Sequence, residues 1–250
     1  MIITTRERDD FSRACTIAGT VLRSLQPVIQ AGVLTGDIAR EAERLIEKEG
    51  GTAAFKGYRG FPGTICISLN EEVVHGIPSK QRTVKEGDLV SLDVGVRYNR
   101  MYGDCAATFP VGRIRDRHLV LLDVTRQALK AGIAKAVAGN RTGDIAAAIQ
   151  GYVEANGFSV VRDLAGHGIG SRLHDYPEIP NFGMAGRGDL LVENMALAVE
   201  PMVNELAYPV KVLSDGWTIV TRDGGYSCHF EETILVGREQ PLILTGAVPE

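Results

Sequence analysis

The sequence predicts an α+β protein in which two similar halves pack as pseudo-twofold mates over one mostly antiparallel sheet. Two observations carry this prediction. Pairs of helical patterns are each followed by a run of short strand patterns, an order typical of α+β folds rather than of alternating βαβ units. The pentapeptide Thr-Gly-Asp-Ile-Ala occurs at 35–39 and again at 142–146, which indicates an internal repeat.

The first half opens with two predicted helices. Apolar residues at helical spacing indicate an amphipathic helix over residues 6–30, which Pro27 should end or kink. Thr35 has the residue type of an N-cap and is expected to open a second helix that runs to Gly50. A loop rich in glycine and aromatic residues follows at 57–63.

Residues 89–109 are predicted to form two β-strands folded back on each other, after a short apolar strand at 65–69. Asp is depleted in strands, yet Asp93 and Asp104 each stand within one arm of this hairpin. A turn tip at 98–99 would place the two acids directly opposite each other, where like charges are destabilising. A fold that accepts this pair is expected to hold a cation between the carboxylates. A tip shifted by one residue is expected to send the side chains to opposite faces.

The second half repeats the same order of patterns. A long helix is predicted over 115–138, and a second helix is expected to begin at Thr142 and end at Gly157. No Ser/Pro-rich linker or block of charge separates the halves. All 250 residues are therefore expected to form one domain, with halves at about 6–112 and 113–240.

The offset between the two pentapeptides also relates acidic residues of the two halves. It carries Asp93 to Glu200, which again follows an apolar strand pattern. It carries Asp104 to Lys211, so the second half must hold an insertion before its own second acid. Glu231, in a strand pattern near the end of the chain, supplies that acid.

Composition narrows the classes of function. A net charge of −4 gives no footprint for nucleic acid or for an anionic membrane. The first residues turn charged at once and lack an apolar signal core, and no run approaches the roughly 18 apolar residues of a membrane span. The four cysteines lack CxxC spacing, which favours free thiols in a reducing compartment. We therefore expect a cytoplasmic protein with neither nucleic acid nor membrane as a partner.

The four acids and one histidine form a candidate metal site. His167 lies in a Gly-rich run, which leaves backbone room around its imidazole. Carboxylates with an imidazole suit a divalent first-row metal rather than a thiolate zinc site. Two divalent ions would nearly neutralise four carboxylates, which without ions would raise one another's pKa. Two-metal sites hold their ions about 3.5–4 Å apart, so some carboxylates must bridge.

Several motifs in sequence order resemble those of the type I methionine aminopeptidases, which have the pita-bread fold with a curved sheet. The resemblance spans residues 73–233 and extends to the helical N-terminus. The matching motifs are Val73-Val74-His75-Gly76-Ile77-Pro78, Ser91-Leu92-Asp93-Val94-Gly95, Gly103-Asp104, Gly166-His167-Gly168-Ile169-Gly170, Leu173-His174, Glu200-Pro201 and Phe230-Glu231-Glu232-Thr233.

This resemblance implies a set of metal ligands in a single metallopeptidase domain. Asp93 would chelate one ion, Asp104 and Glu231 would bridge two ions, and His167 and Glu200 would bind the second. The cofactors implied are two divalent ions, and cobalt, manganese, iron and zinc all accept such oxygen and nitrogen ligands.

The resemblance also implies three catalytic residues. Water activated by the two ions would attack the first peptide bond of the substrate. Glu200 would accept a proton from that water and pass it to the leaving amine. His174 would donate to the developing oxyanion, a contribution of roughly 3–4 kcal/mol in hydrolases. His75 would contact the scissile amide and orient it.

The methionine pocket of the family maps onto five residues. Two of them depart from the common pattern, because Phe61 stands where tyrosine is common and Leu173 where an aromatic residue is common. Both remain apolar, and a polarisable thiol nearby suits an unbranched thioether. The expected substrate-binding residues are Tyr58, Phe61, Cys66, Leu173 and Trp217, together with His75 and His174.

The function implied is removal of the N-terminal methionine from nascent proteins and peptides, preferentially before a small second residue. Nascent N-terminal segments and the ribosome are the expected partners, and a monomer is expected. The nearest alternative is an X-Pro aminopeptidase or dipeptidase of the same fold. Those enzymes carry an extra N-terminal domain and a further histidine where this chain has Asp163. A non-catalytic pita-bread binding protein is disfavoured because all five ligands are present.

Two further interpretations concern the type of aminopeptidase and three residues that are not assigned to the site. A type II enzyme would hold a long insertion in its second half, whereas only a short stretch separates His174 from Glu200. His229 and Glu232 lie close to Glu231 and are interpreted as facing away from it, so neither is assigned as a ligand. His118 is expected to be solvated on a helix surface.

Overall fold

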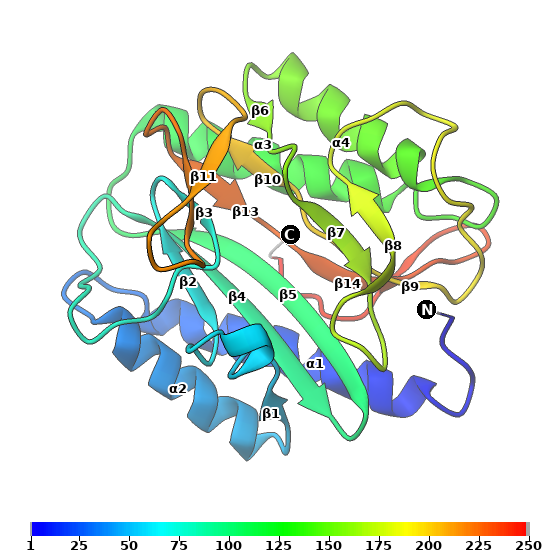
Figure 1. The fold of residues 1–250 in the computed structure, drawn as a ribbon, viewed down its shortest axis with the longest axis horizontal. Helices are drawn as coiled ribbons and strands as arrows, with labels where there is room; N and C mark the ends of the chain where they lie inside the picture. The colour runs from blue at the N-terminus through cyan, green and yellow to red at the C-terminus, as the bar shows by residue number, and fades with distance from the viewer. Residues whose placement is uncertain (1, 249–250) are drawn as a thin grey trace.

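The computed structural model describes residues 2–248 and places a layer of strands between two pairs of helices (Figure 1). Helices α1 (Arg8–Leu25) and α2 (Thr35–Lys48) lie along one side of the strands. Helices α3 (Asp116–Ile133) and α4 (Thr142–Ala155) lie on the other side. The predicted α+β architecture is confirmed.

The strands are short outside one long hairpin, and the strand pairs of the described chain are antiparallel. One sheet runs β1-β4-β2 with β5 on β4, and another runs β15-β14-β9-β7-β8. The strands are β1 Thr52–Ala53, β2 Cys66–Leu69, β3 Glu72–Val74, β4 Leu89–Tyr98, β5 Met101–Pro110, β6 Ser159–Val160, β7 Ala165–Gly168, β8 Asp175–Pro180, β9 Ala196–Val199, β10 Met202–Asn204, β11 Val210–Val212, β12 Ile219–Thr221, β13 Ser227–His229, β14 Glu232–Leu235 and β15 Leu242–Ile243.

The helix ends follow local chemistry, with one correction. Helix α1 ends at Leu25, and Pro27 lies in a short 3-10 helix (Gln26–Val28) directly after it, as its fixed φ and missing N–H require. Thr35 is not the N-cap of α2, because it is the first helical residue and Leu34 precedes it. Its hydroxyl instead accepts the N–H of Ser79 at 2.9 Å.

The internal repeat appears in the backbone hydrogen bonds. The N–H of Thr35 donates to the carbonyl of Arg82 at 2.8 Å, and the N–H of Thr142 donates to the carbonyl of Asp189 at 2.9 Å. The two acceptors are separated by the same offset as the two donors, as predicted from the repeated pentapeptide. The second helix of each half is therefore held at its first residue by an equivalent backbone hydrogen bond.

The β4–β5 hairpin has a different register from the predicted one. Its turn tip is Asn99–Arg100, and Asp93 pairs with Ala106 while Asp104 pairs with Gly95. Asn99 adopts φ 52°, a left-handed conformation that asparagine accepts more readily than most residues. The prediction that the two aspartates are directly opposite is wrong.

The expectation that such a shift would separate the acids is also wrong. Moving the tip by one residue moves every cross-strand partner by two residues, and side chains alternate with a period of two. Asp93 and Asp104 therefore stay on the same face as diagonal neighbours. That geometry still brings their carboxylates toward a common site.

Helix α3 carries a second correction, because His118 is buried with 1% of its area exposed. Its ring stacks on Tyr226 at 4.1 Å between centroids, and its Nε2 lies 3.5 Å from a carboxylate oxygen of Glu205. Strands β10 and β13 pack against α3, a contact that the helix pattern alone did not indicate.

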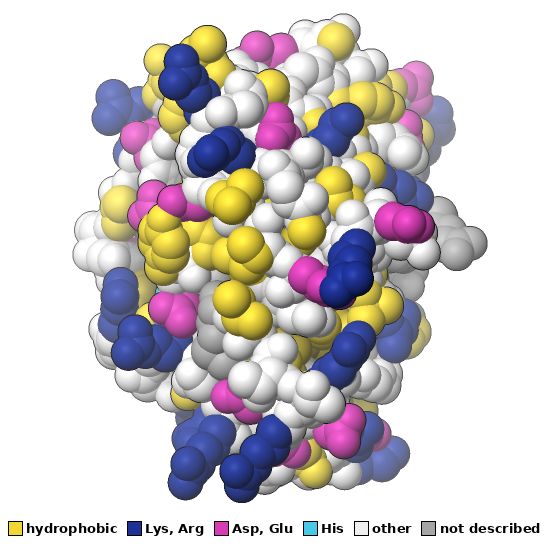
Figure 2. All heavy atoms as spheres, turned by 90° about the vertical axis from the view of Figure 1, so that its right-hand side faces the viewer, with side chains coloured by type: hydrophobic (Ala, Val, Ile, Leu, Met, Phe, Trp, Pro, Cys, Tyr) yellow, Lys and Arg dark blue, Asp and Glu magenta, His cyan; other side chains and the backbone are white. Residues whose placement is uncertain are grey.

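The outer surface mixes apolar and charged side chains. Figure 2 shows the face on the side of β8 and β9, where hydrophobic side chains gather near the centre and charges of both signs surround them. Within residues 2–248, no helix is long and apolar enough to cross a membrane.

Candidate metal centre

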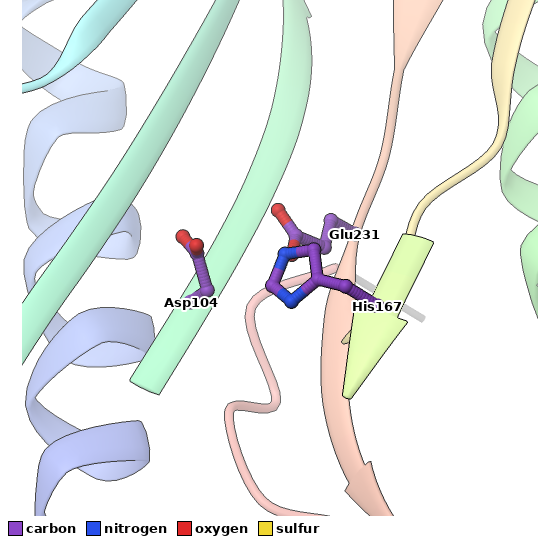
Figure 3. Close-up of side chains that lie close together, drawn as sticks. All are labelled: Asp104, His167 and Glu231. Atoms are coloured by element: carbon purple, nitrogen blue, oxygen red, sulfur yellow. The ribbon is translucent and has the colours of Figure 1, made fainter. Parts of the chain in front are cut away.

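Three side chains from distant parts of the sequence lie close together between strands (Figure 3). Asp104 extends from β5, His167 from β7, and Glu231 from the residue directly before β14. One potential ligand atom of each lies within 4.8 Å of those of the other two, and all three residues are buried. The backbones of β5 and β14 approach here, because the N–H of Glu231 donates to the carbonyl of Ala106 at 2.8 Å.

Asp93 and Glu200 complete the predicted set of five ligands around the same pocket. Glu200 directly follows β9, and its Oε1 lies 3.6 Å from His167 Nε2. The Oδ1 atoms of Asp93 and Asp104 are buried and have no hydrogen-bond partner within residues 2–248. Buried carboxylate oxygens of this kind require either a proton or a cation.

Burial dominates the electrostatics of the cluster. It raises the pKa of Asp93 to about 7 and that of Glu200 to about 7. Burial and the neighbouring carboxylate of Asp93 raise the pKa of Asp104 well above its usual range, and burial and Asp104 do the same for the pKa of Glu231. Four such acids cannot all ionise near neutral pH without a compensating cation. The oxygen and nitrogen donors fit divalent first-row metal ions.

The hydrogen bonds of His167 leave one ring nitrogen available. Its Nδ1 lies 2.9 Å from the carbonyl oxygen of Gly168. A carbonyl only accepts, so Nδ1 carries the proton and Nε2 keeps a free lone pair directed toward Glu200. This is the orientation in which metal-binding histidines are commonly held.

Two further histidines lie beside the cluster. Desolvation and the imidazole of His167 lower the pKa of His174, whose Nδ1 lies 2.9 Å from the hydroxyl oxygen of Tyr58. Burial and the imidazole of His229 lower the pKa of His75 to about 4. Both rings are therefore neutral near pH 7 and can each donate one N–H. His75 also adopts φ 59°, a strained backbone conformation that is concentrated at functional sites.

An apolar cavity of about 190 Å³ ends at the four acids. Tyr58, Phe61, Cys66 and Trp217 line it, and the Phe61 and Trp217 rings meet edge to face at 5.2 Å. Leu173 does not line this cavity, although it belongs to the same buried apolar cluster as Phe61 and Cys66. The structure thus brings the predicted pocket residues together, with Leu173 outside the lining itself.

The chain is similar to known proteins over nearly its whole length. A family model described as metallopeptidase family M24 matches residues 9–238. The chain belongs to metallopeptidase family M24. It is 48% identical over 233 residues to the methionine aminopeptidase of Clostridium acetobutylicum, covering 93% of each chain. It is 46% identical to methionine aminopeptidase 1 of Bacillus subtilis, covering 93% of this chain and 94% of that one.

Two solved structures share the fold of this chain. The crystal structure of the methionine aminopeptidase from Thermotoga maritima has a TM-score of 0.96 at 43% identity, covering 98% of both chains. An Xaa-Pro dipeptidase from Bacillus anthracis has a TM-score of 0.81 at 22% identity and is covered over 63% of its length. The latter likeness shows the fold alone. The pita-bread fold and the resemblance to methionine aminopeptidases are confirmed.

Two lining residues of this M24 pocket were not predicted. Phe55 and Arg59 line the cavity, and both lie in or beside the Gly/aromatic loop at 57–63. Phe55 also explains Gly95 of the hairpin, because a Cβ added there would lie 2.4 Å from the Phe55 ring. The aromatic residues clustered around that loop were the sequence feature that could have indicated these lining residues.

His229 is a further correction. The interpretation that it faces away from Glu231 is wrong, because residues two apart in an extended strand point to the same side. His229 is buried, and its Nε2 lies 3.5 Å from Glu200 Oε2. Glu232 does point elsewhere, since it accepts the N–H of Val248 at 2.8 Å and so anchors the C-terminal segment.

Proposed function

We propose that this chain is a methionine aminopeptidase that removes the N-terminal methionine of nascent proteins and peptides, preferentially before a small second residue. The observation that carries the proposal is the apolar cavity that ends at the buried acids. An unbranched thioether side chain fits such a cavity, while the first peptide bond would reach the acids. Close relatives named methionine aminopeptidase support the same activity.

We assign two divalent ions to the five ligands. Asp93 would hold one ion, Asp104 and Glu231 would bridge both, and His167 and Glu200 would hold the second. Ions bound there supply Lewis-acid polarisation of a carbonyl and a lowered pKa of water. Cobalt, manganese, iron or zinc suits this donor set.

The side chains around the ligands have separate tasks in this proposal. Glu200, at the edge of the proposed ion site beside His167, would accept a proton from the attacking water and return it to the leaving amine. The hydroxyl of Tyr58 donates to Nδ1 of His174, so the single N–H of the neutral ring is on Nε2 and would donate to the developing oxyanion. His75, beside Trp217 at 6.3 Å between ring centroids, orients the scissile amide.

Organisation and partners follow from the same proposal. The whole chain acts as one metallopeptidase domain, as a monomer in the cytoplasm. Its partners are the N-terminal segments of nascent polypeptides, presented at the ribosome.

A peptide panel tests the proposed activity. Protein stripped with a chelator and reloaded separately with Co²⁺, Mn²⁺, Fe²⁺ or Zn²⁺ is assayed for free methionine from Met-Ala and Met-Leu peptides. We expect rapid release before Ala, slow release before Leu and none without metal. Cleavage of Ala-Pro peptides instead, or no release from any peptide at full metal loading, overturns the proposal.

A further inference from the structure

The two carboxylate oxygens of Glu200 face two different imidazoles. Oε1 lies 3.6 Å from His167 Nε2, and Oε2 lies 3.5 Å from His229 Nε2. Because the Nδ1–H of His167 is engaged by the carbonyl of Gly168, the space between His167 Nε2 and Oε1 suits a shared ion. Oε2 is therefore left for His229.

His229 has the burial and the missing partner that this contact requires. Its side chain is 2% exposed. Its Nε2 has no hydrogen-bond partner among the described residues, because the approach to Glu200 falls just outside hydrogen-bond geometry. A buried N–H without a partner is costly, and Oε2 of Glu200 is the acceptor that faces it. Hydrogen bonds at such sites are often long before substrate or ions bind and tighten afterwards.

The backbone of His229 is held from both sides by one hydroxyl. Thr108 Oγ1 accepts the N–H of His229 at 2.9 Å and donates to its carbonyl oxygen at 2.9 Å. Thr233 holds Asp104 in the same way, at 3.2 and 2.7 Å. His229 thus occupies, in the second half, the backbone place that the proposed ligand Asp104 occupies in the first. The backbone that carries this imidazole is therefore held beside the proposed metal centre.

We propose that His229 is a positioning residue for Glu200, donating its Nε2–H to Oε2 so that Oε1 stays turned toward the ion beside His167. This inference rests on the proposed metal role of Glu200. His229 Nε2 faces Oε2, whereas the other oxygen of Glu200 faces His167. This division of the two oxygens favours a hydrogen bond from His229 to Glu200 over direct coordination. Partners of this kind typically raise metal affinity 10–100-fold.

A double-mutant cycle in titration calorimetry with Mn²⁺ tests the inference. We expect His229→Ala to weaken one of the two ions by about 10–100-fold. His229→Gln retains an N–H donor and is expected to restore most of that affinity. In a Glu200→Ala background, which lacks the acceptor, the added His229→Ala should change metal affinity no further. His118→Gln, a buried histidine outside the centre, serves as the control and should leave affinity unchanged.

The outcomes separate this inference from the proposed function. If Glu200→Ala leaves metal affinity intact, the ligand assignment itself fails. If Glu200→Ala weakens binding but His229→Ala costs the same in both backgrounds, the positioning role alone is overturned. The absorption spectrum of the Co²⁺-loaded protein is a second readout, for which His229→Gln should match the unmodified chain. A spectrum showing one nitrogen ligand fewer means direct coordination and contradicts the proposal. Melting temperatures confirm that each variant is folded.

Discussion

Strands β5 and β13 are held in the same way by a threonine hydroxyl from the other half, but they deliver different side chains to the centre. On β5 the backbone of Asp104 is clasped by Thr233, and on β13 the backbone of His229 is clasped by Thr108. The two threonines are as far apart in the sequence as Asp104 is from His229. The hydroxyl clasps are therefore a repeated feature that joins one half to the other.

The side chains at matched places have diverged. Where the first half has the small Ala106, the second has Glu231, and these two residues exchange backbone hydrogen bonds at the meeting of the halves. The repeat therefore gives the two halves the same backbone arrangement. Different side chains at matched positions then combine the two halves into one site. The matched pairs are Asp93 with Glu200, Asp104 with His229, and Ala106 with Glu231. The expectation that Glu231 is the counterpart of Asp104 is therefore wrong.

Replacing Glu231 with alanine, the residue at the matched position of the first half, should have the largest effect on metal binding and activity. Glu231→Ala gives the second half the residue that the first half has at Ala106, and it removes a proposed bridging ligand. We expect both ions to bind more weakly and methionine release to fall by more than about 100-fold, since even partners of ligands contribute that much. Glu232→Gln, one residue further on and facing away, is the matched control and should keep both properties. Retention of two tightly bound ions by Glu231→Ala contradicts the bridging role.

The two aspartates of the hairpin should differ from each other. Asp104→Asn is expected to weaken both ions together in titration calorimetry, because a bridging carboxylate serves both. Asp93→Asn should weaken chiefly one ion. Loss of a single ion in Asp104→Asn, or equal losses in the two variants, argues against their separate roles.

The acids should also make the metal-free protein sensitive to pH. Above about pH 6.5 the histidines of the unfolded chain have released their protons, so the acids dominate the balance. Folded Asp93 and Glu200, with pKa raised to about 7, still bind protons that the unfolded chain has lost, and stability must fall as pH rises. We expect the melting temperature in chelator to drop between pH 6.5 and 8. Glu200→Gln should reduce the slope, and a melting temperature that rises over this range contradicts the assignment.

The two threonine clasps should contribute equally to folding. Thr108→Val and Thr233→Val each leave a buried backbone N–H and carbonyl without their partner, at a cost of about 1–3 kcal/mol. Urea unfolding should give similar losses for the two variants with unchanged m values. Thr52→Val, at an exposed threonine, is the control and should change stability by less than about 0.5 kcal/mol. A large loss of unfolding free energy in only one of the two threonine variants means that the two hydroxyls do not stabilise the halves equally.

The sequence was sufficient for features that depend on local pattern. Helical spacing and Pro27 predicted α1, and the repeated pentapeptide predicted the matching hydrogen bonds of Thr35 and Thr142. Acids in apolar strand contexts predicted which carboxylates meet, because an aspartate such as Asp93 is rarely placed in a buried strand without a partner.

Features set by tertiary packing were not accessible in the same way. The left-handed turn at Asn99 moved the hairpin register by one tip residue. The burial of His118 depends on Tyr226 and Glu205, which lie far along the chain. His229 was different, since its two-residue spacing from Glu231 already indicated a shared side of the strand. For His229 the spacing in the sequence was therefore enough to predict the correct side of the strand.

The central claim is that the two halves together hold ions that make this chain release methionine. The most direct measurement is the rate of methionine release from a Met-Ala-Ser peptide against the number of Mn²⁺ ions bound per chain, during titration of metal-free protein. We predict no release without metal and a rate that rises with occupancy until both sites are filled. Undiminished release from the metal-free chain, or none with two ions bound, contradicts the account.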